Sequence, residues 1–158
     1  MRERPSLAVS PPTRPGMLLE VSEPDVAFYR FLLDVTEPGW IRRERAAMSD
    51  EAVRSLLGDD LIRVFVLFGG GVPAGCVELD GRVPDAVELV HVGLATSFRG
   101  RGLGRYLLAA AVETAWDEQP TRVWVRSTNL DDPRRVLLYQ WAGFVPYDTE
   151  RQTVDDGP

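Results

Sequence analysis

Apolar residues recur along this chain at two spacings, one typical of helices and one typical of strands. The helical spacing, together with the end signals around it, predicts helices over Pro24–Asp34, Ser49–Leu57, Gly102–Glu118 and Pro133–Trp141. Short alternating or β-branched runs predict strands over Met17–Val21, Leu61–Phe68, Val72–Asp80, Ala86–Leu94, Arg122–Arg126 and Phe144–Tyr147. The stretch Pro38–Arg45 is polar and rich in arginine, and its pattern predicts neither element.

Glycines mark several of the predicted boundaries. Gly69-Gly70-Gly71 separates two strand-like runs and predicts a hairpin, while Gly58 and Gly143 stand where helices are expected to end. The resulting order of helices and strands predicts a mixed α/β sheet rather than a doubly wound one. We expect one domain over residues 17–150, a flexible leader over residues 1–16 and a disordered tail over residues 151–158.

Composition narrows the functional classes. The chain of 158 residues carries a net charge of −6, and all 18 basic residues are arginine. Long-range repulsion from phosphate backbones disfavours nucleic acid as a partner. No apolar run is long enough to cross a bilayer, no signal peptide is evident, and Cys76 is the only cysteine. We therefore expect a cytoplasmic protein that binds neither nucleic acid nor membrane.

The most informative segment follows the apolar run Ala86–Leu94 and opens the longest predicted helix. Its sequence is Phe98-Arg99-Gly100-Arg101-Gly102-Leu103-Gly104-Arg105. Unpaired N–H groups and the helix dipole favour anions at such a junction, and glycines let a diphosphate approach the backbone. A dinucleotide fingerprint would need a further glycine in place of Leu107, and a P-loop would need a lysine, so neither motif fits.

The spacing Arg99-x-x-Gly102-x-Gly104 resembles the acetyl-CoA signature of the GNAT N-acetyltransferase superfamily. Val92-Gly93-Leu94 looks like the splayed strand of that family. Leu138-Tyr139 and Ala142-Gly143-Phe144 look like its C-terminal signature. The segment from Asn129 to Phe144 is similar to one uncharacterised bacterial branch. The resemblance covers roughly residues 25–150 and implies a central, mostly antiparallel sheet, splayed at the cofactor and flanked by about four helices.

The resemblance implies that acetyl-CoA is the co-substrate and that no metal takes part. The pantetheine arm would lie along Val92, Gly93 and Leu94, and the pyrophosphate would bind the loop. The implied cofactor-binding residues are Val92, Gly93, Leu94, Arg99, Gly100, Arg101, Gly102, Leu103, Gly104, Arg105 and Asn129. Asn129 stands further from Tyr139 than is usual in the family, by about the length of Asp131-Asp132-Pro133. Asp132 and Pro133 suit the start of a helix.

Two residues are candidates for proton transfer. Tyr139 aligns with the acid of the family, and a buried ring that serves packing is the alternative. Glu88, in an otherwise apolar strand, aligns with the glutamate that many members use through water, and an edge glutamate facing solvent is the alternative. His91 is the only histidine, and an unbulged strand would turn it to the face opposite Glu88, which favours a structural role.

The acceptor is predicted to be a primary amine of a small molecule or peptide. Trp40 and Arg43 lie where the family builds its acceptor pocket; a solvated arginine cluster beside a packed indole is the simpler interpretation. If functional, the cluster would favour an anionic acceptor. Alternatives to acetyl transfer are a non-catalytic acyl-CoA sensor and an acyltransferase with a different donor. The resemblance is compatible with a homodimer. Cys76 is expected to be a small buried side chain.

Overall fold

The computed structural model describes residues 1–9, 16–36, 40–129 and 131–149, with the backbone alone at residues 40–42. Its elements are β1 (Gly16–Val21), α1 (Val26–Thr36), α2 (Trp40–Ala46), α3 (Asp50–Leu57), β2 (Ile62–Gly69), β3 (Val72–Asp80), β4 (Ala86–Leu94), α4 (Leu103–Asp117), β5 (Arg122–Val125) and α5 (Pro133–Trp141). A 3₁₀ turn at Thr96–Phe98 joins β4 to the loop before α4. The tail predicted over residues 151–158 lies outside the described residues.

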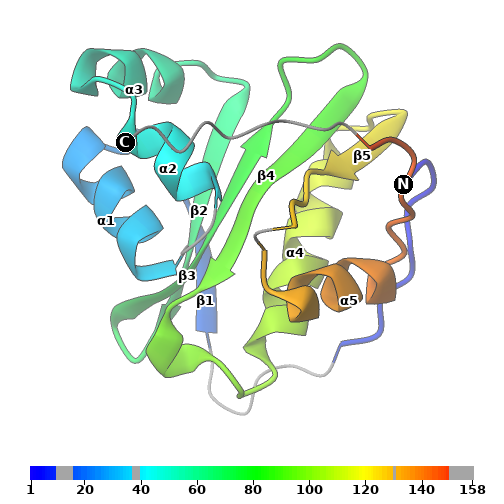
Figure 1. Ribbon diagram of the computed structural model, residues 1–158. Helices are drawn as coiled ribbons and strands as arrows, with labels where there is room; N and C mark the ends of the chain where they lie inside the picture. Colours follow the sequence, from blue (N-terminus) through cyan, green and yellow to red (C-terminus); the bar gives the residue numbers. More distant parts are fainter. Residues whose placement is uncertain (10–15, 37–39, 130, 150–158) are drawn as a thin grey trace.

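The five strands form one sheet in the order β1-β2-β3-β4-β5. Neighbours are antiparallel from β1 to β4, and β4 and β5 are parallel. Helices α1, α2 and α3 cover one face of the sheet and α4 and α5 the other (Figure 1). The mixed sheet and the hairpin between β2 and β3 confirm the predicted fold class.

Each face of the sheet carries its own hydrophobic core. Buried side chains such as Leu79, Leu89 and Leu107 pack between the sheet and α4, and Tyr29, Leu32 and Val53 pack on the face of α1 and α3. Strand residues reach these two cores alternately because successive side chains point to opposite faces. The same alternation decides on which side of the sheet each polar side chain of β3 and β4 lies.

The structure corrects the sequence analysis at two elements. Phe144–Tyr147 is irregular rather than a strand. Phe144 is buried, but Val145 and Tyr147 are exposed, and Pro146 has no N–H to offer a neighbouring strand. In the stretch from Pro38 to Arg45, for which no element was predicted, α2 begins at Trp40.

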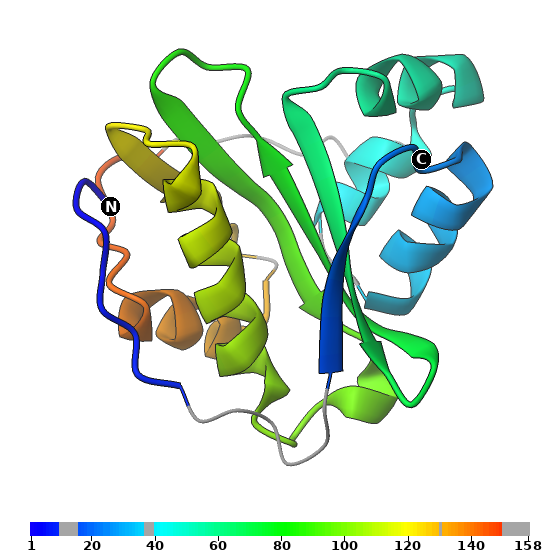
Figure 2. The same cartoon turned by 180° about the vertical axis from the view of Figure 1, so that it is seen from behind.

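The first residues of the chain lie beside α4 (Figure 2). The carbonyl of Met1 accepts a hydrogen bond from the Val123 N–H at 3.0 Å, and Arg4 pairs with Asp117 at 3.1 Å. These contacts add residues at the start of the chain to the α4 side of the domain. The flexibility expected of the leader stays a prediction.

Candidate active site

The two parallel strands separate at the middle of β4. Residues Ala86 to Leu89 pair with Arg122 to Val125. Beyond Leu89, no strand among the described residues pairs with this edge of β4, although β3 continues to pair with the other edge as far as Leu94. The edge at Val92, Gly93 and Leu94 can therefore accept an extended ligand that bonds as a strand would.

The loop that follows β4 is open to solvent. Residues Arg99 to Gly102 are exposed, and Gly100 and Gly102 have φ values of 75° and 76°. A Cβ built on either glycine would have no other atom within 4 Å. Among the described residues, the N–H groups of Gly100, Arg101 and Gly102 donate to no backbone carbonyl, and α4 begins at Leu103. These amides and the first turn of α4 form a place suited to a diphosphate.

Three guanidinium groups lie around this loop. Arg99 donates from Nε to the Leu94 carbonyl at 3.2 Å, at the end of β4. Arg101 stacks over the Phe98 ring at 5.3 Å and Arg105 over the Trp141 ring at 5.1 Å. Each side chain is held by a neighbour while its residue stays exposed, so the positive charge is concentrated at the loop.

Tyr139 lies on α5 and is buried against the α4 side of the sheet. Its ring meets that of Phe144 edge-on, with centroids 5.9 Å apart, and the two backbones are joined by a hydrogen bond. The neighbouring Leu138 comes within 3.8 Å of the position of a Cβ on Gly104. Helix α5 thus packs next to the first turn of α4 through Leu138, and Tyr139 follows Leu138 on that helix.

Glu88 lies on the other face of the sheet, where it is 7% exposed. Arg126, just after β5, places Nη2 3.1 Å from Oε1 and 3.3 Å from Oε2 of this carboxylate. Burial raises the pKa of Glu88; the charge of Arg126 lowers it, whereas Asp80 and Glu44 raise it, and the net shift is upward. The interpretation of Glu88 as a solvent-facing edge residue is therefore wrong.

A bulge in β4 changes the relation between Glu88 and His91. Glu78 pairs with His91 and Leu79 pairs with Leu89, so Val90 is an extra residue opposite β3. Both Glu88 and His91 consequently lie on the same face as Glu78. His91 is buried, and its Nε2 lies 2.9 Å from the Thr36 hydroxyl at the end of α1. The expectation that Glu88 and His91 lie on opposite faces assumed an unbulged strand and is therefore wrong. The contact with Thr36 supports a structural role for His91.

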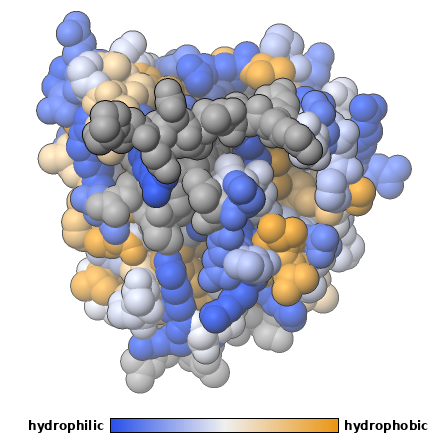
Figure 3. Space-filling model, in the orientation of Figure 1, coloured by the Kyte–Doolittle hydropathy of each residue, from blue (hydrophilic) through white to orange (hydrophobic). Residues whose placement is uncertain are grey.

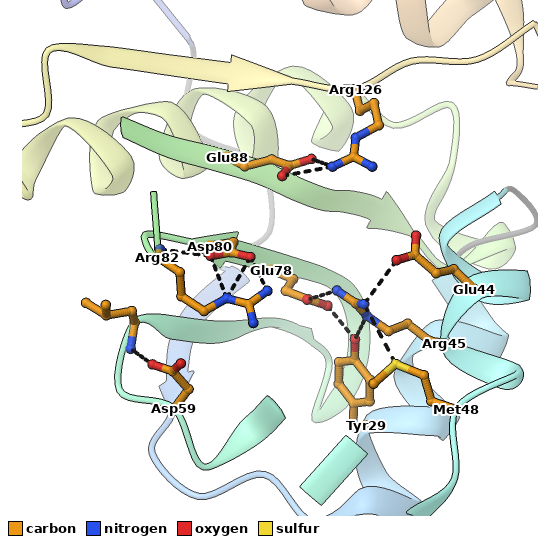
Figure 4. A network of polar contacts seen from close by, with 11 residues as sticks. Tyr29, Glu44, Arg45, Met48, Asp59, Glu78, Asp80, Arg82, Glu88 and Arg126 are labelled. Atoms are coloured by element: carbon orange, nitrogen blue, oxygen red, sulfur yellow. Dashed lines mark hydrogen bonds and ion pairs between the residues drawn. The ribbon is translucent and has the colours of Figure 1, made fainter. Parts of the chain in front are cut away.

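The sequence analysis missed a buried polar cluster formed by Tyr29, Arg45 and Glu78 (Figure 4). Glu78 is completely buried; it accepts a hydrogen bond from the Tyr29 hydroxyl at 2.5 Å and one from Arg45 Nη2 at 2.9 Å. Arg45 Nε also donates to the Tyr29 oxygen at 3.1 Å. A glutamate in the apolar strand Val72–Asp80 was the available signal, because such a residue requires a partner.

The other predicted site residues lie outside the glycine-rich loop and the edge of β4. Asn129 is exposed in the turn after β5, Arg43 is exposed on α2, and the side chain of Trp40 lies outside the described residues. Arg45 is buried with Glu78, so it does not belong to a solvated arginine cluster.

Two further residues have structural roles. Asp132 caps α5 by accepting a hydrogen bond from the Arg134 N–H at 2.9 Å. Burial raises the pKa of Cys76, as expected for a structural thiol.

Two surface hollows lie elsewhere. One of about 410 Å³ is lined by Arg63, Ala86, Glu118 and neighbouring residues, near the start of β4 and the end of α4. A second lies between the starts of α1 and α3. Neither includes a predicted site residue, so the loop and the separated strand edge, rather than these hollows, are the candidate site. Within the described ranges, no helix could cross a membrane and no His, Cys, Asp and Glu side chains form a metal-binding group.

The sequence matches the model of the "Acetyltransferase (GNAT) family" over residues 26–144, which is more than half of the chain. The chain belongs to the GNAT acetyltransferase family. The match includes both the glycine-rich loop and Tyr139, and acetyl transfer is the general activity of this family. A comparison with curated protein sequences gives no match.

Solved GNAT structures share the fold. An IAA acetyltransferase from Bacillus cereus ATCC 14579 has 23% identity and a TM-score of 0.65, covering 85% of this chain and 79% of that one. The GNAT family protein SP0256 from Streptococcus pneumoniae TIGR4 has 15% identity and a TM-score of 0.65, with coverage of 90% and 99%. The aminoglycoside N-acetyltransferase AAC(6')-Iy, solved in complex with CoA, has 16% identity and a TM-score of 0.62, with coverage of 94% and 100%.

Proposed function

We propose that this GNAT protein transfers the acetyl group of acetyl-CoA to a primary amine of a small molecule or peptide by direct attack. The observation that carries the proposal is the exposed loop after β4. Among the described residues, the N–H groups of Gly100, Arg101 and Gly102 donate to no backbone carbonyl, and the loop follows the part of β4 that β5 does not pair. The fold shared with a CoA-bound aminoglycoside N-acetyltransferase supports acetyl-CoA as the donor and a small amine as the class of acceptor.

The loop and strand edge fit the two parts of CoA. A diphosphate needs several N–H donors and close backbone approach, which Gly100, Gly102 and the start of α4 offer. The pantetheine arm is an extended chain with amides, for which the unpaired edge at Val92–Leu94 provides partners. Acetyl-CoA, when bound, supplies the activated thioester; the chain itself binds and orients the two substrates.

Tyr139 and Glu88 would divide the proton transfers between the two sides of the sheet. Tyr139, on the α4 side, would give a proton to the departing thiolate, because a phenol is protonated near neutral pH. Glu88, on the α1 side, would take a proton from the acceptor amine directly or through water. The raised pKa of this buried carboxyl brings it closer to the range useful for a base at neutral pH.

The acceptor would enter on the face of the sheet that carries Glu88. Trp40 and Arg43 belong to α2, the helix on that face, and we retain both as proposed acceptor contacts. Arg45 is excluded from such a role because its guanidinium is committed to Glu78 and Tyr29. An anionic acceptor would therefore rely on fewer arginines than the sequence alone suggested.

The cofactor site is tested by Gly102→Ala with Gly71→Ala as its matched control. Both glycines have a left-handed φ and open space around a built Cβ, but Gly71 lies in the turn between β2 and β3. Each variant should lose about 1–2 kcal/mol of stability to backbone strain. Only Gly102→Ala should also lose acetyl-CoA affinity, by about tenfold or more.

Calorimetric titration with acetyl-CoA measures the affinity, and thiol release after addition of an amine library measures transfer. Equal affinity in the two variants, or no binding by the unaltered protein at millimolar acetyl-CoA, would contradict the proposed site. Binding without thiol release for any amine would favour the sensor alternative. Preferential binding of a longer acyl-CoA would favour a different donor.

A further inference from the structure

We propose that Arg126 is a positioning residue of the acceptor side: its guanidinium fixes the Glu88 carboxylate where β4 and β5 separate and keeps that carboxylate ionised. This inference rests on the proposed function only in making Glu88 the base. The contact itself is a feature of the structure and can be tested without turnover.

The geometry of the pair suits this role. Glu88 lies opposite Trp124 in the last paired part of β4 and β5, and Arg126 follows β5 directly. Nη2 lies within 3.3 Å of both carboxylate oxygens. Dashed lines in Figure 4 mark these contacts between Arg126 and Glu88. The guanidinium also packs over the Trp124 ring at 5.5 Å, which restricts its movement. The Arg126 side chain is 48% exposed and that of Glu88 9%, so the pair lies at the boundary between the protein interior and solvent.

One carboxylate oxygen is left able to receive a proton. Oε1 is buried and, among the described residues, accepts no hydrogen bond of good geometry, although Nη2 lies 3.1 Å away. Oε2 accepts the hydrogen bond from Arg126. The contacts with Arg126 involve both oxygens and hold the carboxylate in place. Because an ionised carboxylate has about four lone-pair sites, they leave capacity to accept a proton, as a base requires.

Arg126 is the cation that favours ionisation of Glu88 against the negative charges around it. Asp80 faces it from β3 and Glu44 from α2, and both disfavour a second negative charge. Asp80 is already paired with Arg82, and His91 on the same strand face contacts Thr36. Within the described part of the chain, Arg126 is the cation that contacts Glu88. Its removal would leave burial and two carboxylates opposing ionisation.

The test compares Arg126→Gln with Arg126→Lys and the control Arg122→Gln. Arg122 is the first residue of β5 and also lies over the Trp124 ring, at 5.8 Å, but among the described residues it is Arg126 that pairs with Glu88. Loss of the Arg126 charge should raise the pKa of Glu88 and thus move the acid limb of kcat/KM to higher pH. At a fixed pH on the acid limb, the fraction of the plateau kcat/KM should be about tenfold lower in Arg126→Gln than in the unaltered protein.

Arg126→Lys should restore part of the shift, and Arg122→Gln should leave the limb in place. Titration of the Glu88 carboxyl carbon by NMR should give the same order of pKa values in the proteins without substrate. An unchanged Glu88 titration in Arg126→Gln, or an equal change in Arg122→Gln, would overturn the inference. Absence of acetyl transfer by the unaltered protein would instead contradict the proposed function, and the NMR titration would still decide the role of Arg126.

Discussion

Tyr139 combines two roles that a single substitution can separate. Its ring packs against Phe144 in the core, while its hydroxyl is the proposed acid. Phenylalanine keeps the ring and removes only the hydroxyl. Packing and cofactor affinity should therefore survive the substitution, whereas proton transfer should not.

We expect Tyr139→Phe to lower kcat for acetyl transfer by about a hundredfold, because a positioned general acid contributes rate on that order. The dissociation constant for acetyl-CoA should change by less than about twofold, or less than about 0.4 kcal/mol. Single-turnover kinetics and calorimetry measure the two quantities. Tyr147→Phe is the control, since Tyr147 is exposed beyond α5. Unchanged turnover in Tyr139→Phe would remove the hydroxyl from the mechanism.

The local structure that was predicted correctly depends on nearby residues in the sequence, and the errors arise where distant strands meet. Glycines and arginines between Arg99 and Arg105 report a strand-to-helix turn directly, and the loop is found where their spacing predicts it. The common face of Glu88 and His91 depends on the register with β3, which the spacing within β4 cannot reveal. Arg126 escaped notice for the same reason, because its partner lies 38 positions away.

At the level of elements, the cluster of Tyr29, Arg45 and Glu78 connects α1 and α2 to β3. Each of these three elements supplies one side chain, and all three side chains are buried. The Glu78 carboxylate accepts hydrogen bonds on both oxygens, which offsets the cost of burying its charge. Burial and the Glu78 charge raise the pKa of Tyr29, so its hydroxyl remains a donor throughout the working pH range.

Replacement of Arg45 by methionine should destabilise the fold by about 3–5 kcal/mol, because Glu78 would keep a buried charge without its cation. Urea denaturation at neutral pH measures this loss. Arg43→Met is the control: it removes an exposed arginine from the same helix and should change stability by less than about 0.5 kcal/mol. Similar losses in the two variants would show that α2 depends on its arginines generally and not on the Glu78 contact.

The same cluster explains why α2 was not predicted. Its sequence, WIRRERA, has no clear apolar stripe, and Arg45 is buried through its contact with a strand that lies far along the chain. The predicted strand at Phe144–Tyr147 failed for the converse reason. Its residues have strand propensity, but Pro146 lacks an N–H donor and Val145 has no face of the sheet to cover.

At the scale of the whole molecule, the net charge is negative, but positive charge is concentrated at one loop. The chain carries −6 overall, and hydrophilic side chains spread over the face shown in Figure 3, with hydrophobic ones in separate groups between them. Arg99, Arg101 and Arg105 nevertheless meet at one exposed loop. An anionic cofactor is repelled by the molecule as a whole and attracted to the loop at close range, because salt screens distant charges more than near ones.

These opposing fields make a prediction about salt. When NaCl rises from about 0.05 M to about 0.5 M, the Debye length falls to a few ångströms and the attraction of the loop should weaken, so acetyl-CoA should bind less tightly. Arg101→Gln should lower affinity at low salt and flatten this dependence, since it removes one of the three charges. Arg54→Gln removes an exposed arginine from α3 and changes net charge equally, so it should leave the slope unchanged. Calorimetric titrations over the salt series give the slopes. If the two variants flatten the salt dependence alike, acetyl-CoA responds to the net charge of the molecule rather than to the arginines of the loop. If only Arg101→Gln flattens it, the local positive field at the start of α4 overcomes the repulsion from the acidic surface.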